Sequence, residues 1–200
     1  MTFSQLIDLI RWDMRVNQGL NLDRIRAKLV LIEIRLEQYV YHKFGGNRSP
    51  LQLVWYLSRF FGSVFQWMLC NSNIPGSVTI GKGFRLPHPQ NIIIVESADI
   101  GDFCTIYHNV LIAWNGFQSK IPSRPEIGSQ VLIGAGAIII GDIDIGSYVL
   151  IGAGAIVAQS VPDYSRITSV HPVISSRPLS LEAVEPGSER HLKDPYSIWR

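Results

Sequence analysis

The sequence predicts a mainly β protein, a parallel β-helix of hexapeptide repeats preceded by an α-helical segment. Aliphatic residues recur at intervals of six, namely Ile127, Ile133, Ile139, Ile145, Ile151 and Val157. The fourth position of the same frame is also apolar or small, namely Val131, Ala137, Ile143, Val149, Ala155 and Val161. Glycine follows the aliphatic residue at Gly128, Gly134, Gly146 and Gly152. This pattern indicates short stacked strands with two inward positions and tight corners, three hexads closing one coil.

The frame extends towards the N-terminus with two interruptions. Its earlier members are Ile112, Ile106, Ile100, Ile92, Leu86 and Ile80. Two extra residues fall between Ile92 and Ile100, and a longer insert occupies residues 113–126. Cys104 falls on an inward position, which predicts a small buried side chain. The long insert is expected to carry function because it leaves an otherwise tight wall, although a plain surface loop is the alternative.

The chain divides into three expected parts. Residues 1–72 form a helical region, residues 73–174 the β-helix, and residues 175–200 a C-terminal extension. Helices are expected at 4–16, at 22–43 with Asn21 as the cap, and at 50–70. The 50–70 helix is strongly apolar, so we expect it to pack against other helices or a partner subunit. Peripheral membrane contact is the second alternative and a membrane span the third.

Composition limits the function classes. The chain has 200 residues, 46% of them hydrophobic, and a net charge of +2, with no basic run that would indicate nucleic-acid binding. The two cysteines make no disulfide framework. The first residues place Asp8 within the apolar stretch and lack a basic start, so no signal peptide is expected. We expect a cytoplasmic protein, at the inner face of the membrane if the 50–70 helix contacts lipid.

Two of the five histidines share a position in the repeat. His88 lies two residues after Leu86, and His108 lies two residues after Ile106. Their separation of twenty residues equals one coil of eighteen plus the two extra residues. We therefore expect His108 directly above His88 on one corner, at a strand spacing of about 4.7–4.9 Å. Two stacked imidazoles indicate a catalytic site, whereas a single surface histidine would be incidental.

The repeat and the His88 segment together resemble a known family. The stretches "IGKGFRLPHPQNIIIV", "ESADIGDFCTIYHNV" and "RPEIGSQVLIGAGAIIIGDIDIGSYVLIGAGAIV" are similar to the serine acetyltransferase branch of the hexapeptide acyltransferases. The resemblance covers roughly residues 73–174. It implies a left-handed β-helix, a homotrimer with active sites between subunits, and acetyl transfer from acetyl-CoA to a hydroxyl, with His88 as general base. An imidazole suits this role because its ordinary pKa of about 6.5 lets it accept a proton near neutral pH.

Several positions depart from the serine acetyltransferase pattern. Asn73 stands where the family has the aspartate that supports the base, so it could fix a tautomer but not neutralise an imidazolium. Pro87 replaces an acidic residue, and Ser123 with Arg124 replaces an Arg-His pair of the serine pocket. Histidines at both the 88 and 108 positions are similar to colanic-acid-type O-acetyltransferases of surface-polysaccharide biosynthesis. We therefore expect a sugar hydroxyl as acceptor, with serine as the alternative.

The expected binding residues follow from the same resemblance. For the acceptor, Trp114 would supply an apolar platform, and Asn115 and Arg124 polar contacts. Acetyl-CoA would lie along the small residues of the two IGAGA repeats, which are Gly134, Ala135, Gly152 and Ala153, with Arg166 reaching a phosphate. No metal is expected, since a site of the γ-carbonic-anhydrase kind needs three imidazoles and the frame supplies two. A non-catalytic structural β-helix is the remaining alternative.

Overall fold

The computed structural model describes residues 1–45, 52–114 and 124–169. Three helices come first: α1 (Phe3–Val16), α2 (Leu22–Val40), which continues into a π-helical turn (Tyr41–Gly45), and α3 (Gln52–Cys70). Twelve short strands follow in the described residues, namely β1 (Thr79–Ile80), β2 (Ile93–Ile94), β3 (Asp99–Ile100), β4 (Thr105–Ile106), β5 (Leu111–Ala113), β6 (Glu126–Ile127), β7 (Leu132–Ile133), β8 (Ile138–Ile140), β9 (Asp144–Ile145), β10 (Leu150–Ile151), β11 (Ile156–Val157) and β12 (Arg166–Ile167).

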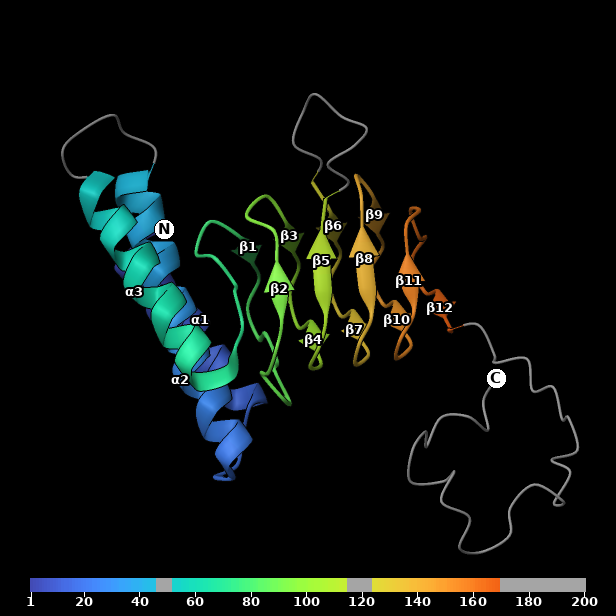
Figure 1. Cartoon of the computed structure of the whole chain (residues 1–200), viewed down its shortest axis with the longest axis horizontal. Helices are drawn as coiled ribbons and strands as arrows, with labels where there is room; N and C mark the ends of the chain where they lie inside the picture. The colour runs from blue at the N-terminus through green and yellow to red at the C-terminus, as the bar shows by residue number, and fades with distance from the viewer. Residues whose placement is uncertain (46–51, 115–123, 170–200) are drawn as a thin grey trace, which may run out of the picture. The chain divides into compact units, whose positions relative to one another are not determined.

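The strands form three parallel sheets, as the hexad pattern predicts (Figure 1). Sheet 1 has the order β1-β3-β6-β9, sheet 2 has β4-β7-β10-β12, and sheet 3 has β2-β5-β8-β11. Consecutive strands along the chain belong to different sheets, so each coil contributes one rung to each wall. The left-handed parallel β-helix with an N-terminal helical segment is therefore confirmed.

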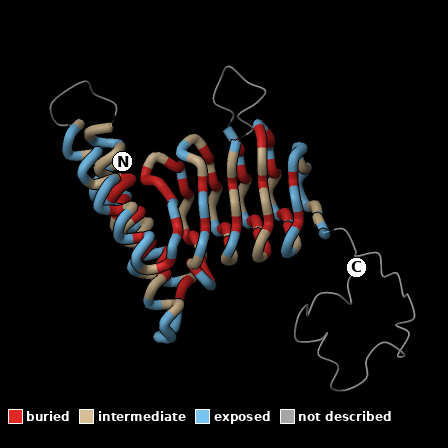
Figure 2. Tube along the Cα trace, in the orientation of Figure 1, coloured by how far each residue is buried: buried red, intermediate tan, exposed pale blue. Residues whose placement is uncertain are grey.

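The aliphatic frame lines the core of the β-helix. Ile100, Ile106 and Ile112 are all buried, and Figure 2 shows buried and exposed residues alternating along the coils. Cys104 is fully buried between two of these strands, which confirms its inward position. Burial raises the pKa of the Cys104 thiol to about 11, so it is an inert apolar side chain at neutral pH.

The two-residue extension of the frame lies at a different corner from the predicted one. Ile94 pairs with Ile112, and Leu86 is one residue after the bridge between Arg85 and Thr105. The extra residues therefore fall between Leu86 and Ile94, and the prediction that they follow Ile92 is wrong. The run of three isoleucines at 92–94 offers two frames of equal apolar quality, and only the pairing register separates them.

The helical segment is fastened to the first coil by buried polar side chains. The Gln66 side chain of α3 accepts from the Ile74 amide at 2.8 Å and donates to the Ile74 carbonyl at 3.0 Å. Arg35 of α2 donates to the carbonyl of Ile80 at 2.6 Å. The predicted cap of α2 is confirmed, because Asn21 accepts from the backbone of Arg24 at 2.9 Å. The contacts of Gln66 and Arg35 hold α3 and α2 against the first coil.

Helix α3 presents a broad apolar surface. Its buried residues are Gly62, Gln66 and Cys70, spaced along one stripe that faces α2 and the first coil. The exposed apolar side chains of the helix include Leu53, Tyr56, Leu57, Phe60, Phe61, Val64, Trp67 and Met68. Among the described residues, no helix is long and apolar enough to cross a membrane.

Candidate active site

His88 and His108 lie together at the corner between sheets 2 and 3. Their ring centroids are 5.8 Å apart, with the ring planes at 89°. The Asn109 amide donates to the carbonyl of Gln90, so Gln90 occupies the position one rung below His108. His88 itself stands on the two-residue extension of this corner. The two imidazoles lie close together, as predicted, but His88 is not the residue directly below His108 in the backbone ladder. It comes close because two extra residues widen the corner.

A carboxylate from the helical segment reaches His88. The Nδ1 atom of His88 lies 2.8 Å from Oδ2 of Asp23, in the first turn of α2. The side-chain amide of Gln90 donates to Oδ1 of the same carboxylate at 2.8 Å. These hydrogen bonds, that from His88 first, hold the pKa of Asp23 below its ordinary value. Asp23 is therefore an anion at neutral pH, placed between His88 and Gln90.

Among the described residues, no hydrogen bond joins Asn73 to His88 or to Asp23. Asn73 bridges to Ile93 at the first rung of sheet 3, and its Oδ1 accepts from Arg59 of α3 at 2.7 Å. Arg59 also lies 3.7 Å from Oε1 of Glu37. The side chain of Asn73 is thus engaged by the helical segment, and its expected support of the base stays a prediction without a contact behind it.

The residues expected to bind acetyl-CoA lie on the same corner as the histidines. The Gly136 amide donates to the carbonyl of His108 at 3.0 Å, and the Gly154 amide donates to that of Ala135 at 2.8 Å. His108, Ala135 and Ala153 therefore occupy equivalent positions in successive coils. A Cβ added at Gly154 would meet no atom within 4 Å, which leaves the backbone edge open to a ligand.

Gly134 and Gly152 have a structural role at this corner. A Cβ at Gly134 would come within 2.5 Å of the Ala153 nitrogen, and a Cβ at Gly152 would lie 3.0 Å from the carbonyl oxygen of Ile167. The close stacking of coils therefore requires glycine at position 134 and favours it at position 152, whether or not a ligand binds. In the two coils after His108 the residues of this corner are glycine and alanine, which leaves room along the edge for a thin chain such as the pantetheine arm of coenzyme A.

The remaining expected site residues lie farther along the coil. Arg166 is exposed on β12 at the end of sheet 2. Trp114 is exposed after β5, at the corner between sheets 3 and 1. Arg124 forms an ion pair with Asp99, and its Nε atom lies 3.4 Å from Oε1 of Glu126. Asp99 and Glu126 are both on the outer face of sheet 1. Asn115 and Ser123 lie outside the described residues. Within one chain, Trp114 and Arg124 are therefore not next to His88, and their roles stay predictions.

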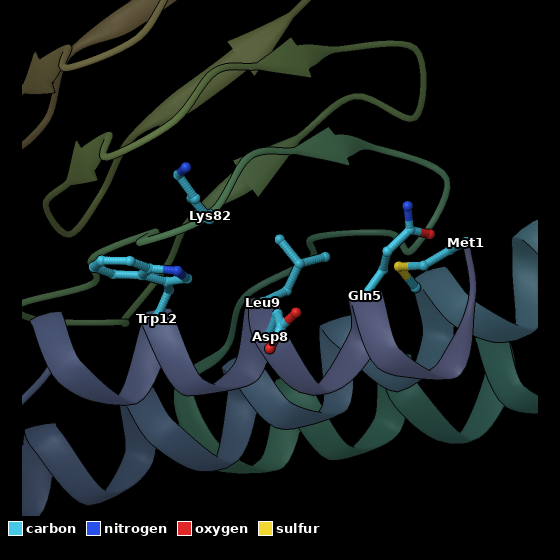
Figure 3. Close-up of a pocket in the computed structure, with 6 residues that line it drawn as sticks. All are labelled: Met1, Gln5, Asp8, Leu9, Trp12 and Lys82. Carbon is cyan, nitrogen blue, oxygen red and sulfur yellow. The ribbon is translucent and has the colours of Figure 1, made fainter.

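A separate groove lies at the corner between sheets 1 and 2. It has a volume of about 610 Å³ and runs between one face of α1 and Lys82, as Figure 3 shows. Trp12 forms its apolar wall, and the Lys82 ammonium lies 5.9 Å from the centroid of that ring. None of the residues expected to act on a substrate lines this groove.

Asp23 and Gln90 are two residues of the site that the sequence pattern did not indicate. Asp23 precedes His88 by sixty-five residues, and its helix shows an amphipathic pattern with no sign of a catalytic role. No spacing rule connects a helix start to a β-helix corner. Gln90 could have been found, since the alternative frame through Ile94 places it eighteen residues before His108 and one rung below it.

Comparisons with known proteins agree with the fold and the repeat. Residues 124–159 match the family of bacterial transferase hexapeptide proteins (six repeats). The chain is 36% identical over 133 residues to a serine acetyltransferase of Staphylococcus epidermidis, covering 66% of this chain and 58% of that protein. It is 35% identical over 160 residues to a serine acetyltransferase of Staphylococcus aureus, covering 78% of this chain and 67% of that protein.

Solved structures show the same architecture. The structure of Neisseria gonorrhoeae serine acetyltransferase matches with a TM-score of 0.70 at 24% identity, over 84% of this chain and 65% of that one. Brucella abortus serine acetyltransferase in complex with coenzyme A matches with a TM-score of 0.69 at 23% identity, over 84% and 67% of the two chains. The chain spans 58% of the length of the Staphylococcus epidermidis relative. With its hexad core and its identity to the Staphylococcus aureus protein, the chain belongs to the hexapeptide-repeat acyltransferases, in the family that contains the serine acetyltransferases.

Proposed function

We propose that this protein is an acetyl-CoA-dependent O-acetyltransferase in which His88 is the general base. The observation that carries the proposal is the His88 corner itself. An imidazole hydrogen-bonded to a carboxylate stands beside His108, and the coils above continue as a track of glycine and alanine. This is the arrangement needed to deprotonate a hydroxyl next to a bound thioester.

In the proposed reaction, His88 is the only group that carries the proton from the acceptor to the leaving group. Nε2 of His88 takes the proton of the acceptor hydroxyl as the hydroxyl oxygen forms a bond to the thioester carbonyl carbon. The carbon–sulfur bond then breaks, and the imidazolium returns the proton to the thiolate of coenzyme A. Backbone N–H groups at a tight corner are suited to stabilise the oxyanion that forms between these steps.

Serine is the acceptor that the relatives favour. Those described above are named serine acetyltransferases, so they support the serine alternative over the saccharide that the departures at Pro87 and Arg124 had suggested. We therefore propose serine first and keep the saccharide as the second candidate.

We further propose that the protein acts as a homotrimer through the outer face of sheet 3. The outward residues of that sheet are all aliphatic, namely Ile93, Leu111, Ile138 and Ile156. On sheet 1 the equivalent residues are Thr79, Asp99, Glu126 and Asp144. The apolar surface of α3 adjoins the sheet 3 face, because Trp67 and Ile93 line one cavity of about 330 Å³. Partner subunits would cover both surfaces, which is why we favour them over lipid as the contact of α3.

Turnover with defined acceptors tests the proposed function. Purified protein is incubated with acetyl-CoA and either serine or a panel of surface-polysaccharide oligosaccharides, and free thiol is measured. We expect serine-dependent release of coenzyme A that His88→Ala reduces by about 10²- to 10⁴-fold. Turnover with a saccharide and none with serine would reverse the acceptor assignment. Full activity in His88→Ala would overturn the role of the base.

A further inference from the structure

We infer that Asp23 and Gln90 together replace the missing family carboxylate and fix the tautomer of His88. This inference rests on the proposed function, since it names the group that positions the proposed base. The residue aligned with the family aspartate is Asn73, which is bound by Arg59. The carboxylate that contacts His88 comes instead from the first turn of α2, at 2.8 Å. The helical segment thus supplies a part of the site that the β-helix lacks.

The position of the proton on His88 follows from its partner. An ionised carboxylate accepts hydrogen bonds and donates none, so the Nδ1 atom facing Asp23 must carry the proton. The neutral ring then has its lone pair on Nε2, where it can accept a proton from the acceptor hydroxyl. The lowered pKa of Asp23 supports this arrangement, because the carboxylate stays ionised at the pH where His88 would act.

Gln90 is a positioning residue in this arrangement. Its amide NH2 donates to Oδ1 of Asp23, so Oδ2 is left to face His88. Arg26, at 3.8 Å from Oδ1, adds a weaker contact on the same side. Gln90 can reach Asp23 because it occupies the rung position under His108, while the extension of the corner carries His88 outward. The widened corner and Gln90 therefore together fix the orientation of the Asp23 carboxylate towards His88.

The experiment compares variants by tautomer and by rate. In Asp23→Asn the amide can turn either its oxygen or its NH2 towards His88, so the Nδ1–H form is no longer enforced. We expect kcat/KM to fall by about 10²- to 10⁴-fold. The ¹⁵N shifts of His88 in [¹⁵N]histidine-labelled protein should change from the Nδ1–H pattern to a mixture. These shifts are read without substrate, so they report on the inference even if the acceptor is wrong.

A complementary double variant separates positioning from mere folding. When Asp23→Asn is combined with Gln90→Glu, the new carboxylate accepts from the amide NH2, which turns the amide oxygen towards His88. We expect this pair to regain the Nδ1–H pattern and at least tenfold of the lost kcat/KM. Asp102→Asn, at the corner between sheets 1 and 2, is the matched control and should leave the ¹⁵N shifts and kcat/KM unchanged.

Different results would contradict the role of Asp23 and the proposed function. Unchanged ¹⁵N shifts and unchanged kcat/KM in Asp23→Asn would overturn the inference while leaving the proposed function in place. A double variant as poor as the single one, with its ¹⁵N pattern still mixed, would remove Gln90 from the assignment. Full turnover in His88→Ala would instead overturn the proposed function itself.

Discussion

Arg35 of α2 and Asp13 of α1 form a buried, two-point ion pair beneath the first coil. Nε of Arg35 lies 2.8 Å from Oδ2 of Asp13, and Nη2 lies 3.2 Å from Oδ1. Asp13 also accepts from the amide of Phe84 at 2.9 Å, and Arg35 donates to the carbonyl of Gly81 at 2.6 Å. The pair therefore holds α1, α2 and the first coil of the β-helix together.

Removing one partner of this pair should be costly. Arg35→Met leaves the Asp13 carboxylate buried without its cation, so we expect the free energy of unfolding to fall by about 3–5 kcal/mol. Urea unfolding followed by circular dichroism measures the change. The exposed pair of Arg11 and Asp8 supplies the control, since Arg11→Met should cost less than about 1 kcal/mol. Equal effects of the two substitutions would contradict the role of the buried pair.

Stability should fall as the pH rises through neutrality because of Glu33. Burial, with Glu37 nearby, raises the pKa of Glu33 to about 7, above its ordinary value of 4.5. The native state therefore binds a proton that the unfolded chain has already lost, and this stabilisation disappears as Glu33 ionises. We expect a lower unfolding midpoint at pH 8.5 than at pH 6, measured at one protein concentration. Glu33→Gln should remove most of the difference, and an unchanged difference would contradict it.

The acetyl-CoA track should be sensitive to side-chain size at Ala153. A leucine there would fill the edge along which we propose that the pantetheine arm lies, without entering the core, because Ala153 is exposed. We expect Ala153→Leu to raise the KM for acetyl-CoA by about tenfold or more, with the unfolding midpoint unchanged. Gln159→Leu adds the same side chain at an exposed position beyond this corner. If both variants keep the original KM, the track lies elsewhere.

The proposed subunit interface can be tested on two matched strand residues. Ile156 of sheet 3 is 70% exposed in the single chain, and Leu150 of sheet 2 is 38% exposed. Ile156→Glu should convert trimers to monomers, because a buried carboxylate at a contact is strongly unfavourable. Light scattering after size exclusion gives the mass. Leu150→Glu should leave the mass unchanged, and the reverse pattern would move the interface to sheet 2.

Much of the fold could be predicted because the hexad pattern states which residues face inward. Ile100, Cys104 and Ile106 are buried as the frame requires. The frame was ambiguous only where Ile92, Ile93 and Ile94 follow one another, and that ambiguity misplaced the extension that carries His88. Apolar periodicity identifies a wall well but cannot count the residues of a corner, since corner residues do not contact the core.

The site could be predicted only as far as it lies on the repeat. His88 and His108 each lie two residues after an inward aliphatic residue, so their proximity could be expected, although Gln90 holds the rung position below His108. Asp23 reaches the site through the packing of α2, which depends on contacts such as Arg35 with Ile80 and Gln38 with Val78. These are long-range side-chain to backbone bonds, and no local pattern in the sequence encodes them.

The corners let this architecture change its chemistry without changing its core. Twenty residues separate Ile80 from its partner Ile100, twenty-seven separate Ile100 from Ile127, eighteen separate Ile127 from Ile145, and sixteen separate Ile145 from Val161. The rungs stay paired throughout, so corner length behaves as an independent variable. An engineer could therefore graft, lengthen or trim one corner to redirect specificity, and the stack of isoleucines beneath would be left intact.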